Sequence, residues 1–477
     1  MLIDGVVGVG WSLVRADAYG GGGVVGGTRV RRYGSTARTR EQVLGALGVV
    51  KVATAAQIRL LVCPGTADAA TVRGGCKDLE AGGLVLSAGR ATRVEPDGRR
   101  ITEKLWSLTP AGLEAAAVVL DRVPREMGGT AKAAAASGAK HAVKVTDTLA
   151  AFLQTPPEPT APVVRKGTVP APAMEPVERP PGLGPIAAWS TEVPLPVTGS
   201  FAAPGRGSVR ADMVFTAPHT ALPLLFVEVD NGTESPPILA EKIARYRRFL
   251  ARSVPQTGRA AVGGDVALWS TVWTTPAPKC RETHPPLAIV FTKQMTPAAM
   301  ETRMREVERL SVQEWRGHWH TAGTHSDGTR DGYRDYTGVV PVIVTVLDLL
   351  EEHGPHGPIW RRYGRRIYET LTDALANPDD HHAYSVREEQ RRAADELKRR
   401  REEQEHQEER RRRDAAAWRC PECGRKVYPA SLPWGTKAAP GGLCDICRHR
   451  ADRDAEQARV FAGQIWPHLN ELFWTHF

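Results

Sequence analysis

The sequence predicts a multidomain α+β protein. Three observations lead to this fold class. Segments with helical spacing of apolar residues precede a hairpin signal near the N-terminus, short β-like runs flank an amphipathic helix in the middle, and two Cys-x-x-Cys pairs lie near the C-terminus. At roughly 150 residues per domain, a chain of 477 residues suggests about three domains.

The composition indicates a polyanionic partner and a reducing compartment. The formal net charge is +9, and a basic excess favours nucleic acid over a membrane surface. Four of the seven cysteines form the two Cys-x-x-Cys pairs and the others are scattered, which is not the pattern of a disulfide framework. The first residues lack the features of a signal peptide, and no run approaches the roughly 18 apolar residues of a membrane span. We therefore expect a cytoplasmic protein without a membrane partner.

The N-terminal part combines helical segments with a hairpin signal. Residues 1–37 are Gly-rich and have no helical period, so we expect them to be disordered. Residues 38–125 contain three helical segments, with Thr54 capping the second, and then two extended stretches joined at Asp97-Gly98. This order resembles a winged helix-turn-helix, in which the third helix enters the major groove of DNA.

Basic side chains occur where such a fold would contact phosphates. Two of them lie four residues apart on the third helix, and the others lie on or near the hairpin. The DNA-binding candidates are Arg73, Lys77, Arg90, Arg93, Arg99 and Arg100. Phosphate contacts supply the sequence-independent part of the affinity for duplex DNA. One alternative is a helical domain whose basic face is only solvated. Another is a surface for protein contacts, because winged helices also mediate such contacts.

The central part is predicted to form an α/β domain over residues 138–300. We expect an amphipathic helix at 138–153 and an extended Pro-rich insertion at 155–185. Three β-like runs, an amphipathic helix and a fourth strand follow, which is the pattern of an α/β sheet.

Two further segments follow this domain. Residues 301–383 are predicted to be a mixed α/β extension in which 359–376 form a helix. Residues 384–416 consist largely of Arg, Glu and Gln, and they predict a charged helix that is solvated or coiled-coil-like.

A zinc ribbon is predicted at residues 417–450. Two Cys-x-x-Cys pairs are separated by twenty residues, and each pair can present two thiolates from one tight turn to a structural zinc ion. The four thiols belong to Cys420, Cys423, Cys444 and Cys447. A redox dithiol and an iron–sulfur site are the alternatives, but a redox pair normally lies at a helix start after a strand, which the sequence does not indicate here. Residues 451–477 predict an amphipathic C-terminal helix.

Acidic side chains lie on neighbouring predicted strands. The catalytic candidates are Asp212, Glu228, Asp230 and Lys242. Glu228 and Asp230 alternate with valines, so they share one face of their strand. Carboxylates converging from Asp212 and Glu228 suit magnesium or manganese, which can activate water for phosphodiester cleavage. Lys242, on the next helix, could neutralise developing charge, whereas the alternative is an ordinary sheet with acids at strand ends and no metal.

The constellation resembles the PD-(D/E)xK nuclease fold of restriction endonucleases, with Asp212 as the first acid and Glu228 as the second. The strand reads Glu-Val-Asp where that family usually has Glu-x-Lys, so Lys242 would act as a lysine migrated to the helix. The winged helix followed by KHAVKVTDTLAAFL, RADMVF, FVEVDNGTES and EKIARYRRF is similar to the bacterial replication-relaxation family, over about residues 40–295. This resemblance implies a winged helix fused to a nuclease-like domain, with a role in plasmid replication or mobilisation.

Two functions are therefore expected from different classes. The first is a DNA-binding, metal-dependent nuclease or relaxase-like protein of a plasmid or mobile element. The second is a non-catalytic DNA-binding accessory factor or regulator that keeps the nuclease-like domain as a scaffold. A third hypothesis, a protein adaptor built on the zinc ribbon and the charged helix, predicts no basic face on the winged helix. The expected partners are double-stranded DNA and replication or transfer proteins, and the expected cofactors are structural zinc and magnesium or manganese.

Overall fold

The computed structural model divides the chain into two compact units, residues 1–381 and 382–477. The described residues are 34–63, 68–94, 99–124, 127, 139–153, 182–216, 222–255, 264–274, 284–324, 330–428 and 441–473. Most of the segment predicted to be disordered, the hairpin turn at Asp97-Gly98 and nearly all of the Pro-rich insertion lie outside them. In the described part of the chain, no helix combines the length and the apolar composition needed to cross a membrane.

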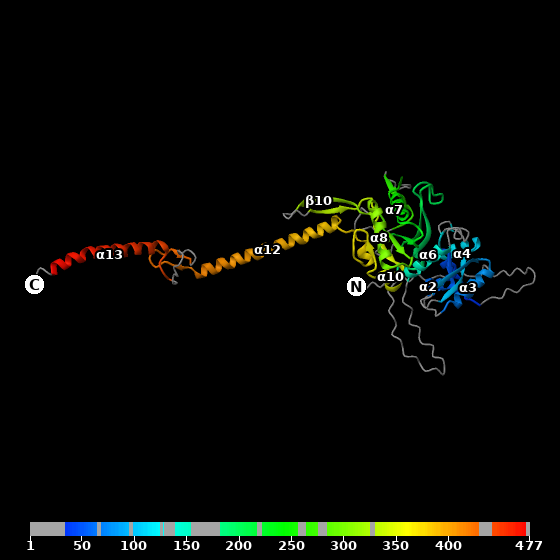
Figure 1. Ribbon diagram of the computed structural model, residues 1–477, viewed down its shortest axis with the longest axis horizontal. Helices are drawn as coiled ribbons and strands as arrows, with labels where there is room; N and C mark the ends of the chain where they lie inside the picture. Colours follow the sequence, from blue (N-terminus) through cyan, green and yellow to red (C-terminus); the bar gives the residue numbers. More distant parts are fainter. Residues whose placement is uncertain are drawn as a thin grey trace, which may run out of the picture. The chain divides into compact units, whose positions relative to one another are not determined.

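The first unit begins with three helices, a β-hairpin and a fourth helix (Figure 1). The bounds are α1 (Ala37–Val50), β1 (Val52–Thr54), α2 (Ala55–Val62), α3 (Ala70–Ala81), β2 (Val85–Val94), β3 (Arg100–Leu108) and α4 (Pro110–Leu120). The three strands form an antiparallel sheet in the order β1-β3-β2. The predicted cap at Thr54 is confirmed, because Thr54 and Gln57 form a reciprocal capping box that satisfies free N–H groups at the start of α2.

The helices pack through the apolar positions that recur at helical spacing. Val72, Cys76 and Leu79 of α3 are buried in one core with residues of α1 and α2, which leaves the opposite face of α3 to solvent. Gly112 of α4 permits the closest approach to the hairpin. A Cβ atom at this position would lie 1.8 Å from the carbonyl oxygen of Leu84, so only glycine allows α4 to pack there without a shift of the backbone.

A six-stranded mixed sheet forms the centre of the first unit. Its strands are β4 (Trp189–Leu195), β5 (Val209–Phe215), β6 (Leu225–Asp230), β9 (Leu287–Phe291), β12 (Val342–Val346) and β13 (Arg361–Arg362). Their order is β13-β12-β9-β6-β5-β4. β6, β9 and β12 are parallel, and β4, β5 and β13 are antiparallel to their neighbours. Parallel neighbours need crossover connections, and these contain α7 (Pro236–Leu250), α8 (Pro297–Leu310) and α9 (Val312–Trp315).

Helices cover both faces of this sheet. One face shares a core with α6 (Ala139–Phe152) and α10 (Leu347–His353), and Val227 and Val229 of β6 belong to that core. The other face shares a second core with α7 and α8, to which Phe226 of β6 belongs. The two-residue period of β6 therefore directs its even-numbered side chains toward α7 and α8.

Hydrogen bonds connect the N-terminal helices to two elements that carry the candidate site, α6 and β4. Gln57 of α2 donates to a carboxylate oxygen of Asp147 on α6 at 2.7 Å. Thr191 of β4 donates its hydroxyl hydrogen to the carbonyl oxygen of Val49 near the end of α1. The N-terminal helices and the large sheet are thus parts of one packed unit.

The segment predicted as an extension, 301–383, contributes β12 and β13 to the same large sheet. The other strands and helices of the first unit are the pair β7 (Ser253–Pro255) and β8 (Asp265–Ala267), the hairpin β10 (His318–Thr324) and β11 (Arg330–Asp335), and α11 (Leu371–Leu375).

The prediction that residues 359–376 form one helix is wrong. That segment contains β13, a turn and the short α11, and Gly364 in the turn has φ 91°, which a helix does not allow. The guanidinium group of Arg362 is buried and donates to the carbonyl oxygen of Ala374 and the side chain of Asn377. These tertiary hydrogen bonds override the helical spacing of apolar residues, and Ile367, which that spacing would bury, is exposed.

The second unit contains two long helices and a small cysteine-rich module. Its elements are α12 (His381–Ala416), β14 (Trp418–Arg419), β15 (Lys426–Val427) and α13 (Asp445–Phe473), α12 beginning at the last residue of the first unit. Figure 1 shows α12 as one continuous helix, and none of its residues is buried. Ion pairs three or four residues apart, such as Arg400 with Glu396, weakly support such a solvated helix. α13 starts at Asp445, inside the range predicted for the zinc ribbon.

Candidate active site and cysteine cluster

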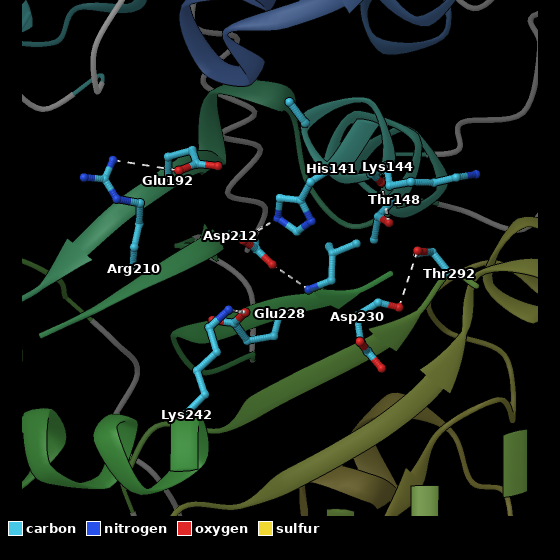
Figure 2. Close-up of polar contacts among 12 residues, drawn as sticks. His141, Lys144, Thr148, Glu192, Arg210, Asp212, Glu228, Asp230, Lys242 and Thr292 are labelled. Carbon is cyan, nitrogen blue, oxygen red and sulfur yellow. Dashed lines mark hydrogen bonds and ion pairs between the residues drawn. The ribbon is translucent and has the colours of Figure 1, made fainter. Parts of the chain in front are cut away.

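Glu228 of β6 and Lys242 of α7 form a buried ion pair (Figure 2). The ammonium nitrogen of Lys242 lies 2.5 Å from Glu228 Oε2, and the hydroxyl group of Tyr246 donates to Oε1 of the same carboxylate. Glu228 is 2% exposed, and Tyr246 is fully buried. The spacing of Lys242 and Tyr246 on one face of α7 brings both groups to the strand, so both oxygens of Glu228 are engaged.

The charges of this pair depend on burial and on Asp212. Burial raises the pKa of Glu228 well above its ordinary value, and the negative charge of Asp212 raises it further. Burial lowers the pKa of Lys242, but the charges of Glu228 and Asp212 outweigh this effect and leave the pKa above its usual value. Lys242 therefore keeps its positive charge at neutral pH beside two carboxyl groups.

Asp212 of β5 is held from two directions. Its Oδ1 lies 3.0 Å from Nε2 of His141 on α6, and its Oδ2 accepts the backbone N–H of Val229 at 2.7 Å. Burial raises the pKa of Asp212, but the contact with His141 and the charge of Lys242 outweigh burial and leave it below the ordinary value. The hydrogen bond with Asp212 raises the pKa of His141. Asp212 is therefore an ionised, oriented carboxylate.

Asp230 lies on the same strand but in a separate interaction. Arg303 of α8 donates to both of its carboxylate oxygens, at 2.6 and 2.9 Å, and the N–H of Gly232 donates to Oδ1 at 2.9 Å. The side chain of Asp230 is 3% exposed. The structure thus brings Asp212, Glu228 and Lys242 together and engages Asp230 elsewhere, as the separation in Figure 2 shows.

Sequence reasoning missed two residues beside Asp212, namely His141 and Glu192 of β4. Their ligand atoms and that of Asp212 all lie within 4.8 Å of one another. The structure gives no support to a metal pair of Asp212 with Glu228, because Glu228 is engaged by Lys242 and Tyr246. A usable signal was present for Glu192, since a carboxylate in the middle of a largely apolar strand needs a partner. No local pattern in the sequence indicated a functional role for His141, because a histidine is an ordinary residue at a polar position of an amphipathic helix.

A pocket of about 250 Å³ opens beside these groups. Its lining includes His141, Glu192 and Asp212 and, from the basic side, Arg210, Lys242 and Arg245. Carboxylates and an imidazole in a pocket that cations also line can hold a divalent cation next to a phosphate group.

The predicted DNA-contacting residues lie apart from this pocket, on α3 and the hairpin. Arg73 and Lys77 are exposed on the solvent face of α3, and Arg90, Arg99 and Arg100 are exposed on or beside the two hairpin strands. Arg93 lies on β2, where it pairs with Ile101, and its side chain is outside the described part of the structure. Exposed basic side chains therefore form a basic surface on α3 and the hairpin, which the exposed Glu80 of α3 interrupts.

The four paired cysteines form one cluster in the second unit. The ligand atoms of Cys420, Cys423, Cys444 and Cys447 all lie within 4.8 Å of one another. The turn between β14 and β15 presents the first pair, and Gly424, with φ 74°, closes that turn. The arrangement is compatible with a tetrahedral zinc site.

The second pair lies at the start of α13, a context that the sequence did not indicate. The backbone N–H groups of Cys423 and Cys444 lower the pKa of the Cys420 thiol to about 6, which favours the thiolate form. A helix start is also the setting of redox dithiols, so the position of the second pair does not by itself exclude that alternative. Four thiols in one cluster still favour metal binding over a two-cysteine redox centre.

The order of the elements and the grouping of His141, Asp212, Glu228 and Lys242 can be compared with known families. Residues 44–266 match the replication-relaxation family model. The match supports the family, and it spans α1 to β8, including every residue of the Asp212 pocket. β9, α8 with Arg303, α12 and the four-cysteine module lie outside it. No curated protein and no solved structure matches the chain.

Proposed function

We propose that the protein binds double-stranded DNA during replication or mobilisation of a plasmid or mobile element and nicks it in a metal-dependent reaction. The observation that carries this proposal is that Asp212 and Lys242 line one pocket together with two arginines, while the buried Glu228 pairs with Lys242. The replication-relaxation match supports a role with DNA in replication or relaxation.

The resemblance to the PD-(D/E)xK fold supports the same proposal. Asp212 and Glu228 lie on adjacent strands, followed by a helix that carries Lys242, and this is the order that the resemblance requires. A bound divalent ion would lower the pKa of a water molecule and polarise the phosphate. Water would attack phosphorus and lose a proton to solvent while the bond to the leaving oxygen breaks, and that oxygen would take up a proton from solvent. Lys242 is placed to stabilise charge that develops on the phosphate oxygens.

The basic surface on α3 and the hairpin supports DNA binding. We propose that this region is a winged helix-turn-helix, with α3 in the major groove and the hairpin along the backbone. The buried face of α3 is used by its own core, so Arg73 and Lys77 are on the face that remains for a ligand.

We expect nicking of supercoiled plasmid by the full chain with magnesium or manganese, and its loss in Glu228→Gln. This substitution keeps the shape of the side chain and removes the carboxyl group that positions Lys242, so the nicking rate should fall at least about 100-fold, as when a group that stabilises transition-state charge is removed. Glu306→Gln, on the partly exposed surface of α8, is the matched control.

Two outcomes would contradict cleavage. One is a folded wild type that binds DNA and leaves both cognate and generic plasmid supercoiled. The other is nicking by Glu228→Gln at the wild-type rate, which would assign the activity to another site or to a contaminant.

The second candidate function is a non-catalytic DNA-binding accessory factor. The observation that favours it is the engagement of both Glu228 oxygens by Lys242 and Tyr246, which is also what a purely structural ion pair would show. Wild-type protein that binds DNA but never nicks it would support this function over the first.

We expect Arg73→Ala to weaken duplex DNA binding at all sequences. Each phosphate contact that is lost should reduce the slope of log affinity against log salt by about 0.9. Fluorescence anisotropy at several salt concentrations measures this slope, and Arg309→Ala, which removes an exposed arginine of α8, is the control. Equal slopes for Arg73→Ala and the control would exclude α3 as the DNA-contacting helix.

A further inference from the structure

We propose that His141, Glu192 and Asp212 bind one divalent transition-metal ion, with Mn²⁺ preferred over Mg²⁺. The role of this ion in cleavage rests on the proposed function, whereas its binding does not. The site differs from the pair of acids expected from the sequence, because it replaces Glu228 with an imidazole and with a carboxylate from the edge strand β4.

The distances suit a single ion. The three ligand atoms lie within 4.8 Å of one another, and His141 Nε2 is 3.0 Å from Asp212 Oδ1. Two ligands bonded at about 2.1 Å to an ion and at right angles to each other are about 3.0 Å apart. The imidazole and the carboxylate therefore already have the separation of neighbouring ligands.

The backbone of β4 directs Glu192 toward Asp212. The register pairs Thr191 with Met213 and Val193 with Ala211, so Glu192 lies across from Asp212 on the neighbouring strand. Glu192 has φ 55°, a left-handed conformation that costs energy for a residue with a Cβ atom. Like charges directly across from each other on antiparallel strands also repel. A cation between the two carboxylates offsets that repulsion.

The alternative is an ordinary ion network around Glu192, and the exposures argue against it. Arg210 is 3.8 Å from Glu192, but its side chain is 55% exposed and can move into solvent. Burial lowers the pKa of Lys51, a buried side chain nearby, to about 8, although the charge of Glu192 tends to raise it. Neither group closes the pocket of about 250 Å³ that exposes the three ligands to an incoming ion.

The ligand types select the ion. Mg²⁺ prefers a shell made of oxygen atoms and retains its waters, whereas Mn²⁺ suits carboxylates and, as a transition metal, tolerates an imidazole of the kind that Fe²⁺ and Zn²⁺ prefer. Two carboxylates together with one imidazole are a mixed set that Mn²⁺ accepts. Lys242, Arg210 and Arg245 line the same pocket, so an ion held here would lie beside the cations that could receive a phosphate group.

The test is Mn²⁺ titration of the full chain, with the four cysteines loaded with zinc and free Mn²⁺ followed by its electron paramagnetic resonance signal. We expect one Mn²⁺ per chain in the wild type. Glu192→Gly and His141→Asn should each weaken binding at least tenfold, since even loss of a group that only supports a ligand commonly costs 10–100-fold. Glycine adopts the positive φ of residue 192 freely, so the first variant relieves backbone strain while it removes the ligand.

Thermal unfolding of each variant shows whether it is folded, and Glu306→Gln is the control with one distant carboxylate removed. Any of three results would overturn the proposal. The wild type could bind no Mn²⁺, the folded variants Glu192→Gly and His141→Asn could both bind Mn²⁺ as tightly as the control, or Mg²⁺ could compete with Mn²⁺ at equal concentration. Mn²⁺ binding without nicking would refute the proposed cleavage and leave the metal site in place.

Discussion

We expect Cys444→Ser to unfold the four-cysteine module while the first unit keeps its fold. The buried core of this module consists of Cys420, Cys444, Cys447 and Val427, with Trp418 and Leu443 packed against it, which is too little apolar surface to fold alone. Zinc binding contributes about 10–16 kcal/mol to such small modules, so it supplies most of their folding free energy. Loss of one thiolate opens the tetrahedral site and removes that contribution.

Hydrogen exchange of the full chain, read by mass spectrometry, measures this effect. Amides of β14, β15 and the first turn of α13 should lose protection in Cys444→Ser or after chelation, and the zinc content should fall from one ion per chain to none. Cys63→Ser, which removes a partly buried thiol of the first unit, is the matched control. Unchanged protection after complete zinc removal would show that the module folds without metal.

We expect Arg303→Met to destabilise the first unit by about 3–5 kcal/mol, the usual cost of leaving a buried charge without its partner. Arg303 is 13% exposed and Asp230 3% exposed, and two hydrogen bonds join them. Methionine fills part of the space but leaves the Asp230 carboxylate in a region of low dielectric constant. The interaction connects β6 to α8, which lies outside the replication-relaxation match.

Chemical denaturation followed by hydrogen exchange in β6 and α8 measures the change. Arg309→Met removes an exposed arginine from the same helix and should leave stability almost unchanged. The double variant Arg303→Met/Asp230→Asn should regain part of the loss, because the unpaired charge is gone. If Arg303→Met behaves like the control, Asp230 does not depend on Arg303 and returns as a candidate for the chemistry of the site.

Local patterns in the sequence predicted the elements whose partners are close in the chain. The cap at Thr54 and the spacing of the two cysteine pairs are readable because each involves residues a few positions apart or a metal geometry with few solutions. The helix predicted over 359–376 failed for the opposite reason. Its apolar spacing is helical, but the buried guanidinium group of Arg362 receives its partners only when α11 folds back onto β13.

The features of the candidate site also divide into those that the sequence predicted and those that only the tertiary structure decided. The alternation of β6 determined from sequence alone that Glu228 and Asp230 share a face, since successive side chains of a strand point to opposite sides. Which cation each acid meets was decided by the tertiary structure, because α7 brings Lys242 to Glu228 and α8 brings Arg303 to Asp230.

The sequence by itself determined the acidic strands, the basic excess and the four thiols, all of which depend on residue type and short spacing. Only the tertiary structure placed His141 and Glu192 beside Asp212. Residue 141 lies 71 positions from Asp212 and is carried by a helix that packs beside the sheet, so no periodicity along the chain connects them. The conformation of Glu192 depends on its pairing with β5, an interaction that forms only when the edge of the sheet is complete.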